Sequence, residues 1–385
     1  MTTRAAEPVP DVQQASLQQA NKVTAVRYIE AFNHDDWDAV HQVVAPEFVF
    51  HHPMGGTVEA GPDGMASVWS GFKVLSPDSC HPIPIMIAER DHVAVLLPTY
   101  GTFTGTLDTA PPPTGGRLDY GMVNMVRLED GMLVETWFGM DPLVEMQQMG
   151  VAPPSEPRAY TATELATVDR FAEATDDGLD RYDTVTAFDD IIVAIGPRQS
   201  DPRSGSRRVE IHRVGEHGVT LMHRHELSTR PPYTGDPHTD TEASRAVVQR
   251  WMHDVLSRHD LGELDTLVSP HVLIHPTAMP CEAGHYGVDG VAAWLGPQWR
   301  AFPDLAIVDS FTIAEGDIVA GRWAARGTSR GEFMGLPPTG EPVGFTGVTM
   351  YRVEGGRIAE IWDTRNTLGI LGTLNPGLAG DHHHH

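Results

Sequence analysis

The chain of 385 residues contains one sequence pattern twice. The stretch that begins at Glu129 reads EDGMLVETWFGMDPLVEMQQMG, and the stretch that begins at Glu354 reads EGGRIAEIWDTRNTLGILGTL. Each has an acidic residue, a glycine turn, an apolar strand with Glu and then Trp, and a short helical tail. Because an internal repeat requires similar units of structure, this feature constrains the fold more than any local pattern does.

The rest of each copy follows the same order of elements. We define copy one as residues 18–152 and copy two as residues 241–375. Each begins with an apolar helical stripe and a second short helix, followed by a strand that ends in His-Pro and by a third helix. The remaining strands are joined by hairpin turns at EDG and EGG. This order predicts an α+β fold in which a curved antiparallel sheet wraps on helices.

A connector, residues 153–240, belongs to neither copy and has Pro-rich boundaries. Its pattern predicts one helix and two or three strands, which could form a small sheet packed between the copies. His223 and His225 share one strand face, and with His212 or His217 they could in principle bind zinc. We favour solvated strand histidines and expect no metal. Residues 381–385 read DHHHH, which is typical of a purification tag and carries no metal argument.

Composition excludes several classes of function. A formal net charge of −25 would repel a phosphate backbone, so we expect no nucleic-acid partner. No apolar run approaches the roughly 18 residues of a membrane span, and the N-terminal residues lack the apolar core of a secretory signal. The two cysteines, Cys80 and Cys281, indicate a reducing, cytoplasmic setting.

The motifs of both copies resemble the SnoaL-like polyketide cyclase family, within the nuclear-transport-factor-2-like superfamily. Copy two carries AFPDL, GEFMGLPPTGEPV and MYRVEGGRIAEIWDTRNTLGIL, and copy one carries PPTGGRLDYGMVNMVRLEDGMLVETWFGMDPLVEMQQMG. The resemblance implies two cone-shaped α+β barrels, each with a deep pocket, packed sheet to sheet as an internal pseudo-dimer. Further homo-oligomerisation is left open. The resemblance also implies acid/base chemistry without a metal or cofactor. The acid/base residue of the family is an Asp near the end of the C-terminal strand.

Asp141 is the direct carry-over of that family carboxylate, four residues after Trp137. Copy two has Asn366 at the same spacing from Trp362, and an amide cannot act as a base. A carboxylate in an apolar cavity has a raised pKa and can exchange protons near neutral pH. The alternative is that Asp141, which precedes Pro142, only caps the terminal helix.

Asp363 directly follows Trp362 in copy two and raises a separate question. Because alternate strand residues share a face, Asp363 and Arg365 point away from the face that carries Trp362 and Asn366. Asp363 could be the acid/base residue if the pocket lies on its own face, with Arg365 as its charge partner. The alternative is a surface ion pair of little energetic weight.

Further candidates surround these carboxylates. His51 and His275 end the first strand of their copies and could relay a proton or stabilise an enolate, although each could equally be satisfied by local backbone. For the tyrosines and tryptophans the alternative is core packing. The predicted substrate-binding residues are His52, Trp137, Trp362, Tyr120, Tyr351, Arg365 and Asn366.

The sequence therefore favours an enzyme of secondary metabolism that acts on a small, hydrophobic, carbonyl-bearing molecule. The expected reaction is cyclisation, isomerisation or elimination through an enolate. An epoxide or lactone hydrolase on the same fold is the first alternative, and a non-catalytic ligand carrier or scaffold is the second. Because the carboxylates differ between the copies, we also expect that one cavity catalyses while the other does not.

Overall fold

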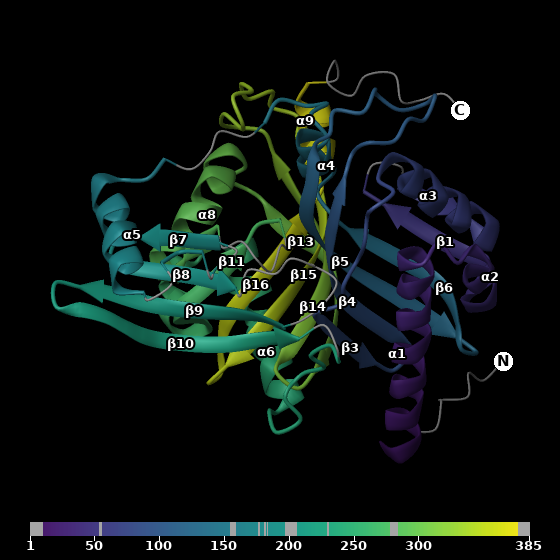
Figure 1. The fold of residues 1–385 in the computed structure, drawn as a ribbon, viewed down its shortest axis with the longest axis horizontal. Coiled ribbons are helices and arrows are strands. Elements are labelled where there is room, and N and C mark those ends of the chain that lie inside the picture. The colour runs from purple at the N-terminus through teal and green to yellow at the C-terminus, as the bar shows by residue number, and fades with distance from the viewer. Residues whose placement is uncertain are drawn as a thin grey trace.

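The computed structural model (Figure 1) describes residues 11–53, 56–154, 159–175, 178–180, 182, 184–196, 206–228, 231–277 and 284–375. Within this part of the chain, two six-stranded sheets lie side by side in the middle of the molecule, and most helices lie outside them. A four-stranded sheet of the connector lies at one end. The predicted tag at 381–385 falls outside the described residues.

Copy one forms a sheet with the strand order β2-β1-β6-β5-β4-β3. Three helices precede or interrupt it, and α4 follows its last strand. The elements are α1 (Asp11–Asn33), α2 (Trp37–Val43), β1 (Val44–His52), β2 (Gly56–Glu59), α3 (Gly61–Leu75), β3 (Ile85–Glu89), β4 (His92–Thr102), β5 (Arg117–Glu129), β6 (Met132–Gly139) and α4 (Pro142–Gln148).

Copy two repeats this order as β12-β11-β16-β15-β14-β13. Its first helix, α6, runs into a π-helical segment, Trp251–Ser257, which has no counterpart in α1. The elements are α6 (Thr241–Arg250), a 3₁₀ turn (Leu261–Glu263), α7 (Leu264–Leu267), β11 (Val268–His275), β12 (His285–Tyr286), α8 (Gly287–Ala301), β13 (Ala306–Glu315), β14 (Ile318–Thr328), β15 (Pro342–Glu354), β16 (Arg357–Arg365) and α9 (Thr367–Leu374).

The sheets differ from the prediction in two respects. They are mixed, because β1 pairs in parallel with β6 and β11 pairs in parallel with β16. The chain between these partners spans most of a copy, and such long connections permit parallel pairing. Each sheet is also open, with edge strands at both ends, so neither copy is a closed barrel.

Local signals in the sequence account for the turns and helix starts. Asp36 caps α2 by accepting a hydrogen bond of 3.0 Å from the Ala39 N–H. The hairpin turns adopt the left-handed conformation at Asp130–Gly131 and at Gly355–Gly356. Such turns match the right-handed twist of the strands they join, so they fix the register of β5 on β6 and of β15 on β16.

The two sheets pack against each other through an apolar core that both copies supply. Ile87, Leu96 and Met125 of copy one lie in the same cluster as Met350 and Trp362 of copy two. This arrangement confirms the internal pseudo-dimer. Separate cores fill the space between each sheet and its own helices.

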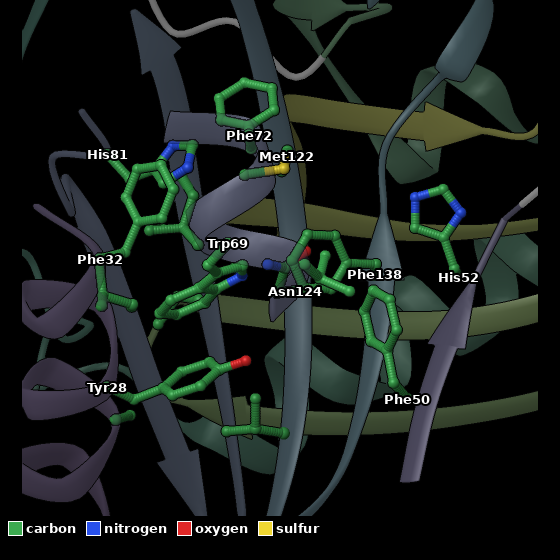
Figure 2. A pocket seen from close by; sticks show the side chains of 16 residues that line it. Tyr28, Phe32, Phe50, His52, Trp69, Phe72, His81, Met122, Asn124 and Phe138 are labelled. Carbon is green, nitrogen blue, oxygen red and sulfur yellow. The ribbon is translucent and has the colours of Figure 1, made fainter. Parts of the chain in front are cut away.

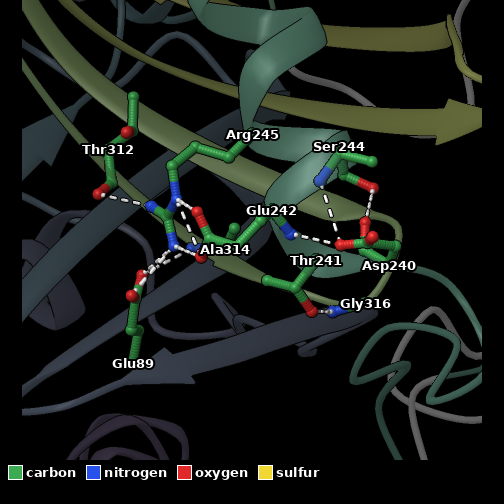
Figure 3. A network of polar contacts seen from close by, with 10 residues as sticks. Glu89, Asp240, Thr241, Glu242, Ser244, Arg245, Thr312, Ala314 and Gly316 are labelled. Carbon is green, nitrogen blue, oxygen red and sulfur yellow. Dashed lines mark hydrogen bonds and ion pairs between the residues drawn. The ribbon is translucent and has the colours of Figure 1, made fainter.

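Two equivalent ion pairs join the copies where β3 meets β13. Lys22 on α1 binds Glu315 on β13 at 2.6 Å, and Arg245 on α6 binds Glu89 on β3 at 2.8 Å. Each carboxylate also accepts a backbone N–H of the other copy, from Ala88 and Ala314 respectively. Figure 3 shows the Arg245 network. The exchange of equivalent contacts is the hallmark of a two-fold interface, here within one chain.

The connector forms an antiparallel sheet with the order β10-β9-β8-β7, covered by one helix. One sheet face packs against both copies, through Tyr100 of copy one and Leu273 of copy two, and the other packs on Phe171 of the helix. The elements are α5 (Ala162–Ala174), β7 (Thr184–Phe188), β8 (Ile191–Gly196), β9 (Ser206–Gly215) and β10 (Gly218–Ser228).

Candidate active site

Each copy encloses a cavity between its sheet and its helices. The cavity of copy one (cavity one) has a volume of about 110 Å³, and that of copy two (cavity two) about 40 Å³. Cavity one is lined by Ala25, Tyr28, Ile29, Phe32, Phe50, His52, Val68, Trp69, Phe72, His81, Val95, Leu97, Met122, Asn124, Val126 and Phe138. Cavity two is lined by Leu256, Trp294, Leu295, Gln298, Trp299, Leu305, Ile307, Trp323, Ala325, Phe345, Tyr351, Asp363 and Arg365.

Asp363 on β16 is a buried carboxylate in the wall of cavity two, and only 2% of it is exposed. Its cross-strand partner on β15 is Thr349, whose hydroxyl donates a hydrogen bond of 2.8 Å to Asp363 Oδ1. The Trp323 indole N–H in turn donates to Thr349 Oγ1 at 2.9 Å. This chain of donors orients the carboxylate within the cavity wall.

Arg365 supplies the charge that balances Asp363. Its Nε donates to Asp363 Oδ2 at 2.7 Å, and its guanidinium lies 5.1 Å from the ring centroid of Trp294. A buried carboxylate without such a partner would be strongly unfavourable. The interpretation of this pair as a surface ion pair is therefore wrong, and the face of Asp363 and Arg365 is the cavity face.

Tyr351 on β15 also lines cavity two, and it is almost completely buried. Burial, reinforced by the negative charge of Asp363, raises the pKa of the Tyr351 hydroxyl. The hydroxyl therefore stays protonated at neutral pH and remains a hydrogen-bond donor. Cavity two thus holds a carboxylate and a phenol that can donate a hydrogen bond.

Cavity one has the same position in copy one but a different chemistry (Figure 2). Aromatic and aliphatic side chains form most of its wall, and its polar members are Tyr28, His52, His81 and Asn124. No carboxylate lines it. Where β16 of copy two has Asp363 opposite Thr349, β6 of copy one has Phe138 opposite Asn124.

Both histidines of cavity one are held in their neutral form. Burial lowers the pKa of His81 to about 4, with the nearby Lys73 charge acting in the same direction. The His81 Nδ1 lies 3.2 Å from the Thr99 hydroxyl. Burial also lowers the pKa of His52. Cavity one therefore contains no charged group at neutral pH.

Asp141 lies at the end of copy one, where it lines neither cavity. It caps α4 by accepting a hydrogen bond of 3.1 Å from the Leu143 N–H. The Thr367 hydroxyl of copy two donates to its other oxygen at 2.5 Å. Burial raises the pKa of Asp141 to about 6, although these two hydrogen bonds oppose the rise. The capping interpretation is confirmed, while a catalytic role of Asp141 stays a prediction.

Asn366 holds the equivalent position in copy two. Its Oδ1 accepts the Gly369 N–H at the start of α9, and its Nδ2 donates to the Pro53 carbonyl of copy one at 2.6 Å. Asp141 and Asn366 are thus helix caps that each reach across to the other copy. Asn366 borders a groove of about 610 Å³ between the copies rather than cavity two.

His51 and His275 lie on the sheet face opposite the cavities. His51 Nε2 is 2.8 Å from Glu135, and His275 Nε2 is 2.8 Å from Glu360. Each imidazole stacks on the Trp of the neighbouring strand, with ring centroids 5.2 Å apart for Trp137 and 5.6 Å for Trp362.

Neither His51 nor His275 lines cavity one or cavity two, and their catalytic role stays a prediction. His51 and Trp137 line the groove between the copies, and the fully buried Trp362 belongs to the core between the sheets. Alternate residues of a strand point to opposite faces of the sheet, and this alternation along β1 and β11 puts His51 and His275 on the face away from the cavities. The next residue, His52, does line cavity one.

Tyr120 on β5 is buried beside α4 and does not line cavity one. Its hydroxyl is hydrogen-bonded to the carboxyl of Glu145, and burial raises the pKa of Glu145 to about 7. Of the two tyrosines predicted to bind substrate, Tyr351 lines cavity two and Tyr120 lines neither of the two cavities.

Sequence reasoning missed Tyr28, His81, Asn124 and Thr349. The last two could have been found by aligning the copies, because Asn124 and Thr349 stand opposite Phe138 and Asp363 in equivalent hairpins. Tyr28 and His81 lie in a helix and a loop, where no sequence period distinguishes a cavity wall from ordinary core. Their roles depend on tertiary contacts alone.

The described residues contain neither a cluster of metal-ligating side chains nor a helix that could span a membrane. No group of three or more His, Cys, Asp or Glu residues within the described ranges could hold a metal ion. The His225 side chain, one of the predicted zinc candidates, lies outside what the structure describes. Among the described helices, none is both long and apolar enough to span a membrane.

Comparison with known proteins gives a family match in both copies. The model of the SnoaL-like polyketide cyclase family matches residues 22–149 and 246–374. No curated protein matches the sequence significantly.

Several solved structures resemble one third of the chain. A candidate polyketide cyclase from Streptomyces antibioticus, IdmH, is 28% identical over 34% of this chain and 99% of its own, with a TM-score of 0.31. AclR, a candidate hydroxylase from Streptomyces galilaeus, is 27% identical over 35% of this chain and 86% of its own, with a TM-score of 0.32. A candidate polyketide cyclase from Acidithiobacillus ferrooxidans is 24% identical over 35% of this chain and 95% of its own, also with a TM-score of 0.32.

The family assignment rests on the two family-model matches, which together span more than half of the chain, and not on these single-copy likenesses. The repeated sheet-and-helix bodies agree with it. The chain therefore belongs to the SnoaL-like polyketide cyclase family and carries two copies of the family domain in tandem.

Proposed function

We propose that this chain is a cofactor-free acid/base enzyme that acts on a small, hydrophobic, carbonyl-bearing molecule. The family membership supports an enzyme of the polyketide cyclase type. We assign the chemistry to cavity two, with Asp363 as the acid/base residue. The observation that carries the proposal is a buried carboxylate, fixed by Thr349 and Arg365, in a wall of aromatic side chains.

In the proposed reaction, Asp363 removes a proton from the carbon next to the substrate carbonyl. The electrons of the broken C–H bond pass to the carbonyl oxygen and form an enolate. Tyr351, which stays protonated, donates a hydrogen bond to that oxygen. The enolate carbon then attacks an electrophilic carbon or expels a leaving group, and protonated Asp363 returns its proton to the product.

The size of cavity two limits which part of the substrate it can hold. About 40 Å³ is too small for a fused ring system. Trp323, Ala325 and Phe345 line both cavity two and the groove of about 610 Å³ between the copies. We therefore expect only the reacting carbonyl end to enter cavity two, while the remainder of the substrate lies in the groove.

The test compares two carboxylates that differ in position. Cyclohexanone in deuterium oxide serves as the probe, and exchange of its α-protons is followed by NMR. Asp363→Asn should reduce the catalysed exchange by at least about 100-fold, the usual range for removal of a general base. Asp141→Asn is the matched control, because the amide oxygen can still accept the Leu143 N–H, as Asn366 does for Gly369 in copy two, and the amide N–H can donate to the Thr367 hydroxyl oxygen.

Three outcomes would overturn the assignment. If the wild-type protein does not accelerate exchange, or if Asp363→Asn exchanges at the wild-type rate, Asp363 is not the base. If Asp141→Asn alone loses exchange, the chemistry belongs to the end of copy one. With a hydrolysable substrate, ¹⁸O from labelled water in the product would instead indicate the hydrolase alternative.

A further inference from the structure

Cavity one contains two buried polar atoms that have no hydrogen-bond partner among the described residues. They are the Tyr28 hydroxyl and Asn124 Oδ1, and each residue is only 4% exposed. Figure 2 shows both side chains directed into the space that Trp69 and Phe138 border. Buried polar atoms are almost always satisfied, so two in one cavity need an explanation.

Comparison of the copies explains why Asn124 is left unsatisfied. In copy two the polar residue at this position, Thr349, bonds to Asp363 on the neighbouring strand. In copy one the neighbouring position is Phe138, which offers no polar atom to Asn124. The partner of Asn124 must therefore come from outside the sheet.

We propose that cavity one is a second binding site, separate from the catalytic site, for a small neutral ring that bears a hydroxyl group. One hydroxyl of the phenol or enol type can satisfy both atoms at once, by donating to Asn124 Oδ1 and accepting from the Tyr28 hydroxyl. The ring would contact Trp69, Phe72 and Phe138, which line the same cavity.

Charge restricts the ligand further. The neutral His52 and His81 leave cavity one without a cation, so an ionised carboxylate would be buried without a partner. The volume of about 110 Å³ suits a single ring rather than a fused system, because an engineered apolar cavity of about 150 Å³ holds benzene. The site therefore favours a neutral ligand that consists of a single ring with one hydroxyl group.

The experiment uses phenol, benzene and benzoate as probes of the full-length protein, with binding followed by NMR titration and calorimetry. Phenol should bind more tightly than benzene, and benzoate should bind least. Tyr28→Phe and Asn124→Leu should each weaken phenol binding by about 2- to 10-fold, the value of one net hydrogen bond, and leave benzene binding unchanged.

Two controls separate this site from a structural role and from catalysis. In the free protein neither Tyr28 nor Asn124 loses a hydrogen bond on substitution, so the melting temperature of both variants should not fall. Thr349→Val is the matched variant in copy two and should leave phenol binding unchanged. Asp363→Asn should likewise leave it unchanged, so failure of the proposed catalysis does not affect this result.

Three results would overturn the proposal. Equal affinity for phenol and benzene would mean that the two polar atoms hold only a water molecule. Loss of phenol binding in Thr349→Val, with retention in Asn124→Leu, would move the site to copy two. A marked fall in melting temperature for Tyr28→Phe or Asn124→Leu would assign these atoms a structural partner instead.

Discussion

Thr349 and Asp363 face each other across β15 and β16, with 2.8 Å between hydroxyl and carboxylate, and the equivalent pair in copy one is Asn124 and Phe138. The different residues at these two positions contribute to the chemical difference between the two cavities. Copy two retains a buried, charge-balanced carboxylate, while copy one has an uncharged wall with unsatisfied polar atoms. The fusion of two copies in one chain allows this divergence, because the interface between them is preserved by other residues.

Removal of Arg365 should destabilise the protein by about 3–5 kcal/mol, because Asp363 would remain buried without its charge partner. We expect Arg365→Met to show this loss in urea unfolding. The double variant Asp363→Asn/Arg365→Met should recover much of it, since no unpaired charge then remains. Equal destabilisation of the single and double variants would show that Arg365 acts through packing on Trp294 rather than through charge.

The ion pair between Arg245 and Glu89 should contribute to the attachment of the two copies. Arg245→Met is expected to lower the free energy of unfolding by about 2 kcal/mol, because it leaves the mostly buried Glu89 unpaired. Arg250→Met is the control, since its pair with Glu263 is exposed and worth about 0–1 kcal/mol. Chemical denaturation measures the free energy of unfolding of both variants. Similar losses for the two would contradict the role assigned to Arg245.

Close backbone approach at the interface should make Gly139 sensitive to substitution. A Cβ there would lie 2.3 Å from the Val123 carbonyl oxygen and 2.6 Å from Val348 Cβ of the other copy. Gly139→Ala should therefore cost about 1–3 kcal/mol in thermal or chemical unfolding. Gly344→Ala, on a strand with open space around the site, is the matched control and should change stability little.

Glu145 should make stability fall as the pH rises. Burial raises its folded-state pKa from 4.5 to about 7, so the folded protein binds the proton more tightly than the unfolded chain does. The resulting stabilisation is complete below about pH 4.5 and is lost as the pH rises through about 7.

Glu145→Gln removes this contribution, because the amide does not titrate. The difference in unfolding free energy between wild type and variant should change by roughly 1–3 kcal/mol between pH 4.5 and 8, with the wild type relatively weaker at high pH. Urea unfolding at several pH values measures it. A constant difference across this range would mean that Glu145 titrates normally.

Much of the architecture could be read from the sequence. The repeat predicted two similar α+β bodies, and the glycine turns predicted the hairpins that fix strand register. Strand alternation placed Asp363 and Arg365 on one face and Trp362 on the other, as the structure has them. These inferences hold because the period of a strand is a local property of the backbone.

The candidate site was less accessible from sequence. His51 and His275 were expected at a pocket mouth but stack on Trp137 and Trp362 on the opposite sheet face. Alternation along β1 and β11 puts them on that face, whereas which face of each sheet the helices cover depends on contacts between elements far apart in the chain. For Asp141 the sequence left a pocket carboxylate and a helix cap open, and the structure shows that it caps α4 and meets Thr367 of the other copy.

The sequence by itself determined that this protein is two related sheet-and-helix units whose carboxylates stand at different positions of the shared motif. Tertiary structure alone decided which faces became cavities, because that depends on which helices and which second sheet cover each face. It also decided that Asp363 is enclosed and that Tyr28, His81 and Asn124 converge on one space. Burial is a property of the packed whole, and no local pattern of residues specifies it.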